Sequence, residues 1–417
     1  MSSSETEMTA RPCRLILLTQ WFDPEPTFKG LLFARELHAR GFNVEVVTGF
    51  PNYPGGRLYP GYRLRPIQRE AIDGVSITRL LLYPSHGQNA FGRIINYVSF
   101  FFAAAIYLIF AARRADILYA YHPPLTVSLA AALAKLFRRT PIVMDIQDLW
   151  PDSLGATGMM KASGPLKIIG WLCRKVYASA AHIVVLSPGF KKMLIRRGVP
   201  EVKISVVYNW ADERAINQVF EDRPSAMNSE GRFRILFAGN MGLAQDLDMI
   251  LNAAKIVAKE NDRIEFCFLG DGLASAGLKQ RVKDESIPNV LFLPKVPMSQ
   301  VGAYLQAADV LLVSLRPDPL FEITIPSKTQ AYMSVGKPVI MAVGGDAANL
   351  VKDAGAGIVT KPGDPKDLAR ATLELAQTTP SLIRKMGSAG QLYYRDHLST
   401  SQGVEAFVRI FENNRRR

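Results

Sequence analysis

Short apolar runs that alternate with helical segments constrain this chain more than any other feature of its sequence. Such runs of four to six residues occur at 14–19, 44–48, 116–121, 141–144, 182–187, 204–208, 234–238, 265–269, 290–293, 310–314 and 339–342. Continuous apolar runs of this length, separated by helical patterns, are typical of parallel strands that are covered on both faces. The pattern therefore predicts an α/β fold built from strand–helix–strand units.

The length of 417 residues predicts two domains rather than one core. Residues 211–232 are polar and contain Pro, Ser and Gly, so they mark the linker. We expect a first Rossmann-like domain at 13–215 and a second at 232–390. A disordered polar tail is expected at 1–12 and a C-terminal helix at 391–417.

Cysteines and charge narrow the functional class. The three cysteines have no Cys-x-x-Cys spacing, which argues against a disulfide scaffold or a zinc site and fits a reducing cytoplasm.

The net charge of +13 is concentrated in the first half, with eight Lys or Arg against two Asp or Glu at 55–114 and nine against one at 153–207. Anionic membrane lipid is the expected partner of this surface, and a surface that is simply solvated is the alternative. No nucleic-acid-binding motif is present, so nucleic acid is not expected.

Residues 94–112 form an uncharged, nearly continuous apolar run between Arg93 and the pair Arg113 and Arg114. A helix of this length would measure about 28 Å, close to the thickness of a bilayer core. It could span a membrane, lie buried in the core, or lie on the outer face of the domain. A spanning helix would separate strands that should share one sheet. We therefore expect an outer helix that lies partly in the membrane interface.

The segment 322–340 predicts a loop, a helix, a turn and a buried strand. Pro326 suits the first helical turn, Ser327 can cap it, and Gly336 ends it. Lys328 lies in the first turn, where a cation is unfavourable unless an anion binds there. This placement indicates a diphosphate site, although an exposed lysine on an ordinary αβ unit would give the same pattern.

This segment resembles the donor-binding segment of retaining glycosyltransferases of family 4, which have the GT-B fold. The resemblance is closest to bacterial enzymes that build O-antigen, capsule and exopolysaccharide. It covers the chain after residue 12 and is most specific at 48–62, 145–153 and 325–340. It implies two Rossmann-like domains that face a central cleft, with the C-terminal helix crossing back to the first. It also implies that Lys328 contacts the donor diphosphate.

The chain departs from the family at its usual pair of glutamates, eight positions apart. Their positions fall on Ile323 and Ala331. Glu322 and Gln330 each lie one position away and become the candidates for holding the donor, together with Ser327. Ribose recognition therefore differs from the family pattern.

The loop after the first strand, at 21–30, faces the donor phosphates and the acceptor in the family. Lys29 and Gly30 stand where many members have two glycines. His122 ends the strand at 116–121, where open α/β sheets place ligands. A structural role is the alternative for Gly30 and His122. The resemblance implies donor contact for Gly30 and acceptor or sugar contact for Lys29, while the strand-end position makes His122 an acceptor or sugar-side candidate.

The segment 145–153 carries three carboxylates at the end of another strand. In the family, a His–Asp pair near the donor sugar occupies this place. Here Gln147 takes the histidine position and Asp148 follows it. Glutamine can hydrogen-bond a sugar but cannot act as a base at neutral pH. We assign Gln147 and Asp148 as catalytic candidates with Lys328, and Asp145 as a sugar-side candidate.

The turn after the first strand of the second domain contains Gly239, Asn240 and Gly242 and approaches the phosphates in the family. It lacks the third glycine of the dinucleotide fingerprint. The family's nearby arginine and lysine are also missing, which leaves more of the phosphate charge to Lys328. Asp246 and Asp248 match a metal-binding Asp-x-Asp pattern, but their place at a helix start explains them without a metal.

The resemblance implies hexosyl-type transfer, with retention, from a nucleotide diphosphate donor such as a UDP-sugar to a lipid-linked or saccharide acceptor. The expected site needs no metal or other cofactor. We expect the protein in the cytoplasm, on the inner face of the cell membrane. A GT-B sugar-nucleotide epimerase and a non-catalytic peripheral membrane protein remain the alternatives.

Overall fold

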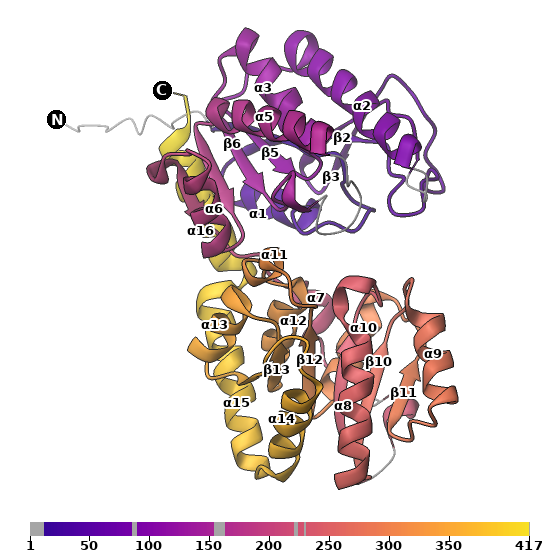
Figure 1. Cartoon of the computed structure of the whole chain (residues 1–417). Coiled ribbons are helices and arrows are strands. Elements are labelled where there is room, and N and C mark those ends of the chain that lie inside the picture. Colours follow the sequence, from indigo (N-terminus) through magenta and orange to yellow (C-terminus); the bar gives the residue numbers. More distant parts are fainter. Residues whose placement is uncertain (1–11, 86–89, 154–162, 221–223, 229–230, 417) are drawn as a thin grey trace, which may run out of the picture.

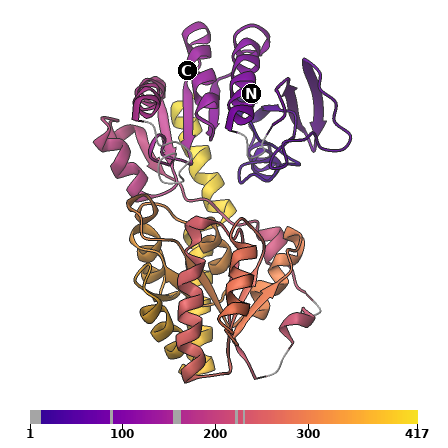
Figure 2. The same cartoon turned by 45° about the vertical axis from the view of Figure 1, so that its right-hand side comes forward.

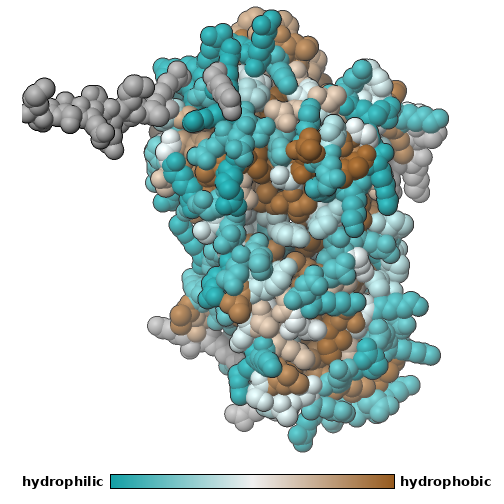
Figure 3. Space-filling view, turned by 90° about the vertical axis from the view of Figure 1, so that its left-hand side faces the viewer, coloured by the Kyte–Doolittle hydropathy of each residue, from teal (hydrophilic) through white to brown (hydrophobic). Residues whose placement is uncertain are grey.

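The computed structural model describes residues 12–85, 90–153, 163–220, 224–228 and 231–416. The chain forms two α/β domains, one above the other in Figure 1. Seen from the side in Figure 3, the surface is mostly hydrophilic, with hydrophobic side chains showing in patches on both domains. The expected tail at 1–12 lies almost entirely outside the described residues.

The N-terminal domain is built on an eight-stranded sheet in the order β3-β4-β2-β1-β5-β6-β7-β8. All neighbouring strands are parallel except the edge pair β3 and β4. The strands are β1 (Arg14–Leu18), β2 (Asn43–Gly49), β3 (Ile67–Ile72), β4 (Val75–Leu80), β5 (Ile117–His122), β6 (Ile142–Ile146), β7 (His182–Val185) and β8 (Ile204–Val206). The helices are α1 (Leu31–Ala39), α2 (Ala90–Ile106) with the π-helical turn η1 (Tyr107–Ala111), α3 (Leu125–Arg138), α5 (Ser163–Ser179), α6 (Pro188–Arg196) and the short η2 (Glu201–Lys203).

The C-terminal domain has a six-stranded parallel sheet in the order β11-β10-β9-β12-β13-β14. Its strands are β9 (Phe233–Ala238), β10 (Ile264–Leu269), β11 (Val290–Leu293), β12 (Val310–Ser314), β13 (Val339–Ala342) and β14 (Gly357–Val359). Its helical segments are α7 (Glu213–Ile216), η3 (Ser225–Met227), η4 (Leu243–Gln245), α8 (Leu247–Glu260), α9 (Ser275–Asp284), α10 (Met298–Ala307), α11 (Pro319–Glu322), α12 (Ser327–Val335), α13 (Gly345–Asp353), α14 (Pro365–Gln377), α15 (Pro380–Tyr393) and η5 (Tyr394–Leu398). The last helix is α16 (Thr400–Asn414).

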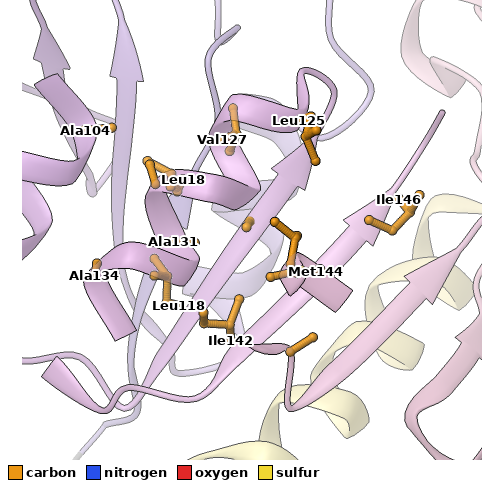
Figure 4. Close-up of a cluster of buried hydrophobic side chains, with 14 of the residues drawn as sticks. Leu18, Ala104, Leu118, Leu125, Val127, Ala131, Ala134, Ile142, Met144 and Ile146 are labelled. Atoms are coloured by element: carbon orange, nitrogen blue, oxygen red, sulfur yellow. The ribbon is translucent and has the colours of Figure 1, made fainter. Parts of the chain in front are cut away.

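Each sheet is covered on both faces because its strands are apolar on both sides. In β1, Ile16 and Leu18 pack with α2, α3 and α5, whereas Leu15 and Leu17 pack with α1 and α16. Figure 4 shows the first of these cores, in which Leu18 and Met144 meet Ala131 of α3. The predicted α/β class with two Rossmann-like domains is therefore confirmed.

The C-terminal helix α16 crosses back and packs on the N-terminal domain (Figure 2). Phe407 meets Phe33 and Tyr119 with ring centroids 5.1 and 5.5 Å apart. The expected start of this helix at 391 falls within α15, which still packs on the C-terminal domain. A π-helical turn at η5 separates the two helices, so the crossing begins at Ser399.

Two local differences from the expectations stand out. The edge hairpin of β3 and β4 and the short edge strand β14 were not among the expected strands, and charged residues interrupt the apolar pattern of β3 and β4. Pro326 is the N-cap of α12 and Ser327 is its first residue, so Ser327 does not cap the helix.

The apolar run at 94–112 lies in α2 and η1. The segment Phe91–Ala111 is long and apolar enough to cross a membrane, but only a third of it is buried. Because β4 and β5 flank this segment and share one sheet, it does not separate them across a bilayer. Its exposed side chains likewise exclude a wholly buried core helix. The placement on the outer face agrees with the expectation, while membrane contact stays a prediction.

Candidate active site

The carboxyl ends of both parallel sheets face each other across the domain boundary. Ser187, which follows β7, donates its hydroxyl hydrogen to the Ile323 carbonyl at 2.5 Å. The backbone N–H of Gly189 donates to Asp346 Oδ2, at the start of α13, at 2.6 Å. We call these opposed sheet edges and their loops the interdomain face. Ligands of open α/β sheets bind at such edges.

Lys328 is the principal cation of this face. It stands in the first turn of α12, half-buried, with Nζ 3.1 Å from Gln245 Oε1 and 3.6 Å from the ring centroid of Phe237. Throughout the described residues, no carboxylate forms a salt bridge with it. Burial therefore lowers the pKa of Lys328 to about 7. A dehydrated ammonium without an anion, beside a helix N-terminus, favours binding of a phosphate or diphosphate.

The turn after β9 gives a ligand close access to this lysine. Gly239 has a φ of +135°, which favours glycine, and a Cβ there would lie 3.4 Å from Lys328 Nζ. Asn240 is exposed, and its amide lies against Gly242, where an added Cβ would approach Nδ2 to 2.9 Å. The structure therefore places Gly239 beside Lys328 and Asn240 beside Gly242 in the same turn, while donor binding by these residues stays a prediction.

The start of α12 is surrounded by three further candidates whose side chains differ in exposure: Glu322, Ser327 and Gln330. Glu322 is exposed at the end of α11, and Ser327 is exposed at the start of α12. Gln330 is buried, and its amide lies 3.1 Å from the carbonyl oxygens of Pro326 and Ser327. Its side chain therefore supports the first turn of the helix rather than facing a ligand.

Lys29 and Asp145 form a closed pair beneath the interdomain face. Both are fully buried, and Lys29 Nζ lies 3.1 Å from Asp145 Oδ2 and 2.6 Å from Asn209 Oδ1. The ammonium also lies 5.1 Å from the ring of Trp210 and 5.5 Å from that of Phe407. In this structure neither charge is presented to an acceptor. Burial lowers the pKa of Lys29, while Asp145 acts in the opposite sense.

Gln147 belongs to the same buried network. Its Nε2 donates to Asp145 Oδ1 at 2.5 Å, and its Oε1 accepts from Asn209 Nδ2 at 2.6 Å. Both ends of the amide are thus occupied within the protein. Asp148, the next residue, keeps an exposed side chain at the interdomain face, although partial burial of its carboxyl by the surrounding protein raises its pKa. Of the two catalytic candidates here, only Asp148 is open to a ligand.

The surroundings of His122 and Gly30 indicate structural roles rather than contact with a ligand. His122 is fully buried with its ring edge-on to Trp150, and burial lowers its pKa to about 3, so it is neutral at physiological pH. Gly30 is buried, and a Cβ there would lie 2.1 Å from Asp23 Oδ2. The Asp23 carboxylate accepts a hydrogen bond from the Leu31 backbone N–H at 2.6 Å. The N-terminus of α1 is therefore occupied by a carboxylate of the same domain.

Two features of the second domain complete the site. Arg316 follows β12, its backbone N–H donates to the Ala244 carbonyl at 3.0 Å, and its guanidinium lies 5.9 Å from the Phe321 ring. Arg316 was not among the predicted site residues, although its place just after a strand end was a usable signal. In the Asp-x-Asp pattern, for which no metal was expected, Asp248 pairs with Arg281 at 2.7 Å. Within the described residues, no group of three His, Cys, Asp or Glu side chains is placed to hold a metal.

Comparison with known families divides the chain as the structure does. Residues 31–210 match the model described as "Glycosyl transferase 4-like domain", and residues 232–378 match "Glycosyl transferases group 1". The two matches together cover most of the chain and lie one in each domain.

Individual relatives agree with these matches. The chain is 26% identical over 313 residues to a probable glycosyltransferase, WbjE, of Pseudomonas aeruginosa, covering 74% of this chain and 77% of that one. It is 23% identical over 241 residues to the amylovoran biosynthesis glycosyltransferase AmsK of Erwinia amylovora, covering 57% and 58%. Among solved structures, HepE of Anabaena in complex with UDP and glucose superposes with a TM-score of 0.66 at 16% identity, covering 96% of this chain and 99% of that one.

Proposed function

Because the chain belongs to the glycosyltransferases, with a 4-like domain followed by a group 1 domain, we propose that it moves a hexosyl-type sugar from a nucleotide diphosphate, such as a UDP-sugar, to a lipid-linked or saccharide acceptor. The proposal includes retention of anomeric configuration and operation without a metal. Relatives in polysaccharide biosynthesis, such as AmsK, support a role in bacterial surface polysaccharide synthesis on the cytoplasmic face of the membrane.

The observation that carries this proposal is the ammonium of Lys328 beside the Gly239 turn, which bonds with the neutral amide of Gln245 and with no carboxylate of the described residues. A donor brings two negative charges on its diphosphate, and more charge develops there as the glycosidic bond breaks. At roughly 4 Å and an effective dielectric near 20, one cation contributes about 4 kcal/mol of Coulomb energy before desolvation. The solved structure of HepE with UDP and glucose supports a UDP-type donor for the shared fold.

The proposed step transfers the sugar without an enzyme nucleophile. An acceptor hydroxyl attacks the anomeric carbon from the face on which the diphosphate leaves. The bond between that carbon and the phosphate oxygen breaks, and its electron pair stays on the diphosphate. The hydroxyl proton passes to the departing phosphate oxygen. Lys328 and the N-terminus of α12 stabilise the growing negative charge.

In the N-terminal domain, Asp148 is the group open to hold a sugar hydroxyl. Its carboxylate accepts hydrogen bonds and can orient a hydroxyl toward the anomeric carbon. Gln147 acts on this site indirectly, because its amide bonds with Asp145 and Asn209 hold the segment that precedes Asp148. This assignment makes Gln147 a positioning residue.

Replacement of Lys328 tests the proposal. By analogy with loss of one preorganised electrostatic group, we expect Lys328→Ala to lower kcat by roughly 10²–10³-fold. The control is Lys337→Ala, which removes a lysine beyond the other end of α12. A screen of sugar nucleotides by thermal stabilisation selects the donor, because a ligand at 100 times its Kd adds about 2.7 kcal/mol.

Other outcomes identify the alternatives. A folded Lys328→Ala protein that transfers sugar within a few-fold of wild type would show that the diphosphate is held elsewhere. Conversion of the sugar nucleotide to its epimer without acceptor would indicate an epimerase. Absence of any sugar-nucleotide binding in calorimetry would indicate a non-catalytic protein.

A further inference from the structure

Four polar side chains beneath the interdomain face form a closed ring of polar contacts. Lys29 Nζ donates to Asn209 Oδ1 at 2.6 Å, and Asn209 Nδ2 donates to Gln147 Oε1 at 2.6 Å. Gln147 Nε2 donates to Asp145 Oδ1 at 2.5 Å, and Asp145 Oδ2 lies 3.1 Å from Lys29 Nζ, which closes the ring. We call these four residues the polar ring. Asn209 was not among the predicted site residues.

The two charged members fix the direction of every bond in the polar ring. An ammonium can only donate, and an ionised carboxylate can only accept. Asp145 therefore turns Nε2 of Gln147 toward itself, and Lys29 turns Oδ1 of Asn209 toward itself. The amide nitrogen of Asn209 then faces the amide oxygen of Gln147, so both amides bond at both ends. Bonds that run in one direction polarise and strengthen one another. Asn209 thus supplies both an acceptor and a donor that the ring needs.

The polar ring fixes the residue that precedes Asp148. Gln147 is held at both ends of its side chain, and its backbone N–H donates to the His122 carbonyl at 3.0 Å. The carbonyl of Asp148 in turn accepts from the Trp150 backbone N–H at 3.2 Å. Asp148 itself keeps an exposed side chain. The ring therefore sets where the Asp148 carboxylate is presented, although its own members bond with one another.

Both segments that join the domains meet at the polar ring. Asn209 and Trp210 lie between β8 and α7, on the segment that leaves the N-terminal domain, and Phe407 lies on α16, which returns to it. The Trp210 and Phe407 rings lie 5.1 and 5.5 Å from Lys29 Nζ. A Cβ on Gly403 of α16 would lie 2.4 Å from the Trp210 ring, so the two segments are in direct contact there. The position of Asn209 is therefore set by both connections between the domains.

Hydrogen bonds tie these two connections together a few residues further on. The Ala211 backbone N–H donates to the Tyr394 hydroxyl at 3.0 Å, and that hydroxyl donates to Glu213 Oε1 at 2.8 Å. The same carboxylate oxygen accepts from the Thr400 backbone N–H, at the start of α16, at 2.7 Å. The outgoing segment and the returning helix thus form one joined unit, and Asn209 links this unit to Gln147.

We propose that Asn209 is a positioning residue for the transfer reaction, which holds the segment of Gln147 and Asp148 in register with the two connections between the domains. The inference rests on the proposed transferase function, because its kinetic effect is exerted through Asp148. Loss of the Asn209 amide should displace Asp148 and slow the transfer step. Donor binding should persist, because Lys328 and the Gly239 turn belong to the other domain.

Replacement of Asn209 by leucine tests this role, because leucine has a similar volume and leaves the direct pair of Lys29 and Asp145 in place. We expect Asn209→Leu to lower kcat by roughly 10–100-fold, as a small displacement of a positioned group does, without a change in the donor KM. Asn209→Asp keeps the acceptor for Lys29 but loses the donor to Gln147, and it should show the same loss. The control is Asn217→Leu, an exposed position further along the same segment, which should leave kcat unchanged.

A double variant separates positioning from a general loss of structure. If Asn209 acts through Asp148, Asn209→Leu should lower kcat little further in a protein that already carries Asp148→Asn, because residues that act as a unit are not additive. Losses that multiply in the double variant would overturn the proposal. A wild-type kcat in either Asn209 variant would also overturn it.

Hydrogen exchange measures the same effect without any activity. Asn209→Leu should speed exchange of the backbone N–H groups of Gln147 and Trp150 and leave that of β9 unchanged. Unchanged exchange at Gln147 and Trp150 would overturn the proposal. If the wild-type protein transfers no sugar from any sugar nucleotide, the proposed function fails, and this measurement alone decides whether Asn209 holds the segment.

Discussion

At the scale of single residues, Lys328 is a cation that the fold partly dehydrates without supplying an anion. Its neighbours are a neutral amide and an aromatic ring, from Gln245 and Phe237. The pKa of about 7 means that the empty site holds the charged form only near and below neutral pH. The ligand itself must provide the interaction that favours the ammonium.

This predicts that donor affinity depends on pH. A bound diphosphate favours the ammonium and raises the pKa of Lys328, so binding above pH 7 takes up a proton. The Kd of a UDP-sugar should therefore weaken by up to about tenfold per pH unit above pH 7, until the pKa of the complex is reached. Calorimetry from about pH 6 to 9 measures this. Lys328→Arg keeps its charge and should remove the dependence; a flat wild-type profile would contradict the prediction.

Glu322 is the carboxylate nearest to the missing family position. Its side chain is exposed, and its carbonyl lies so close to Gly345 that a Cβ there would approach it to 1.8 Å. The start of α13 thus fixes the backbone of Glu322 at the interdomain face. A carboxylate in this place can accept from two ribose hydroxyls.

We predict that Glu322→Gln raises the donor KM by about tenfold, which corresponds to one lost charge-assisted hydrogen bond. The thermal unfolding midpoint should not change, because the side chain is exposed. Glu374→Gln on α14, which removes an exposed carboxylate paired with Arg370, serves as the control. An unchanged donor KM in the Glu322 variant would rule out this role.

At the scale of elements, α2 and its π-helical end η1 leave large apolar side chains exposed to solvent. Phe102 and Phe110 are 57% and 78% exposed, whereas Phe101 packs against the core. Helix α3 packs between α2 and α5 and adds exposed Leu136 and Phe137. Figure 1 shows the three helices together at the upper end of the molecule. Uncovered apolar side chains flanked by arginines predict contact with an anionic bilayer.

We predict that the protein floats with vesicles that contain anionic lipid and that high salt weakens this binding. Serine at Phe102 and Phe110 should release the protein without unfolding it, because neither side chain belongs to the core. Serine at Leu382 and Leu392, exposed positions on α15, is the matched control. Equal recovery with neutral and anionic vesicles would refute the electrostatic part of the prediction.

At the scale of the whole molecule, the two domains are joined by more than their linker. Helix α16 belongs to the end of the chain, yet Phe407 and Phe411 lie in the core of the N-terminal domain. The same helix places the Phe407 ring 5.5 Å from the buried ammonium of Lys29. The N-terminal domain is therefore incomplete without the last residues of the chain.

We predict that Phe407→Ala lowers the free energy of unfolding of the N-terminal domain by about 3–5 kcal/mol, through loss of burial and the cavity that remains. Hydrogen exchange should show reduced protection in β1 and β5 and little change in β9 and β12. Leu392→Ala, an exposed position on α15, provides the comparison. Equal loss of protection in both sheets would show that the domains unfold as one unit instead.

The sequence by itself determined the helices and strands that depend on residues close together in the chain. Apolar runs followed by glycine or polar loops predicted most strands, because a strand buried on both faces needs an unbroken apolar run. The placement of Lys328 in the first turn of a helix was likewise readable, since Pro326 and Gly336 bound that helix in the sequence. The turn at Gly239 and Asn240 followed from its position after a strand.

Only the tertiary structure decided which polar groups are open to a ligand. Lys29, Asp145, Gln147 and His122 look like site residues in the sequence, because each lies at a strand end or in the loop that follows one. Partners from distant segments, such as Asn209 and α16, bury Lys29 and Asp145 and hold the amide of Gln147, and the Trp150 ring lies edge-on to buried His122. Burial of a polar side chain depends on what packs above it, and that neighbour is far away in the sequence.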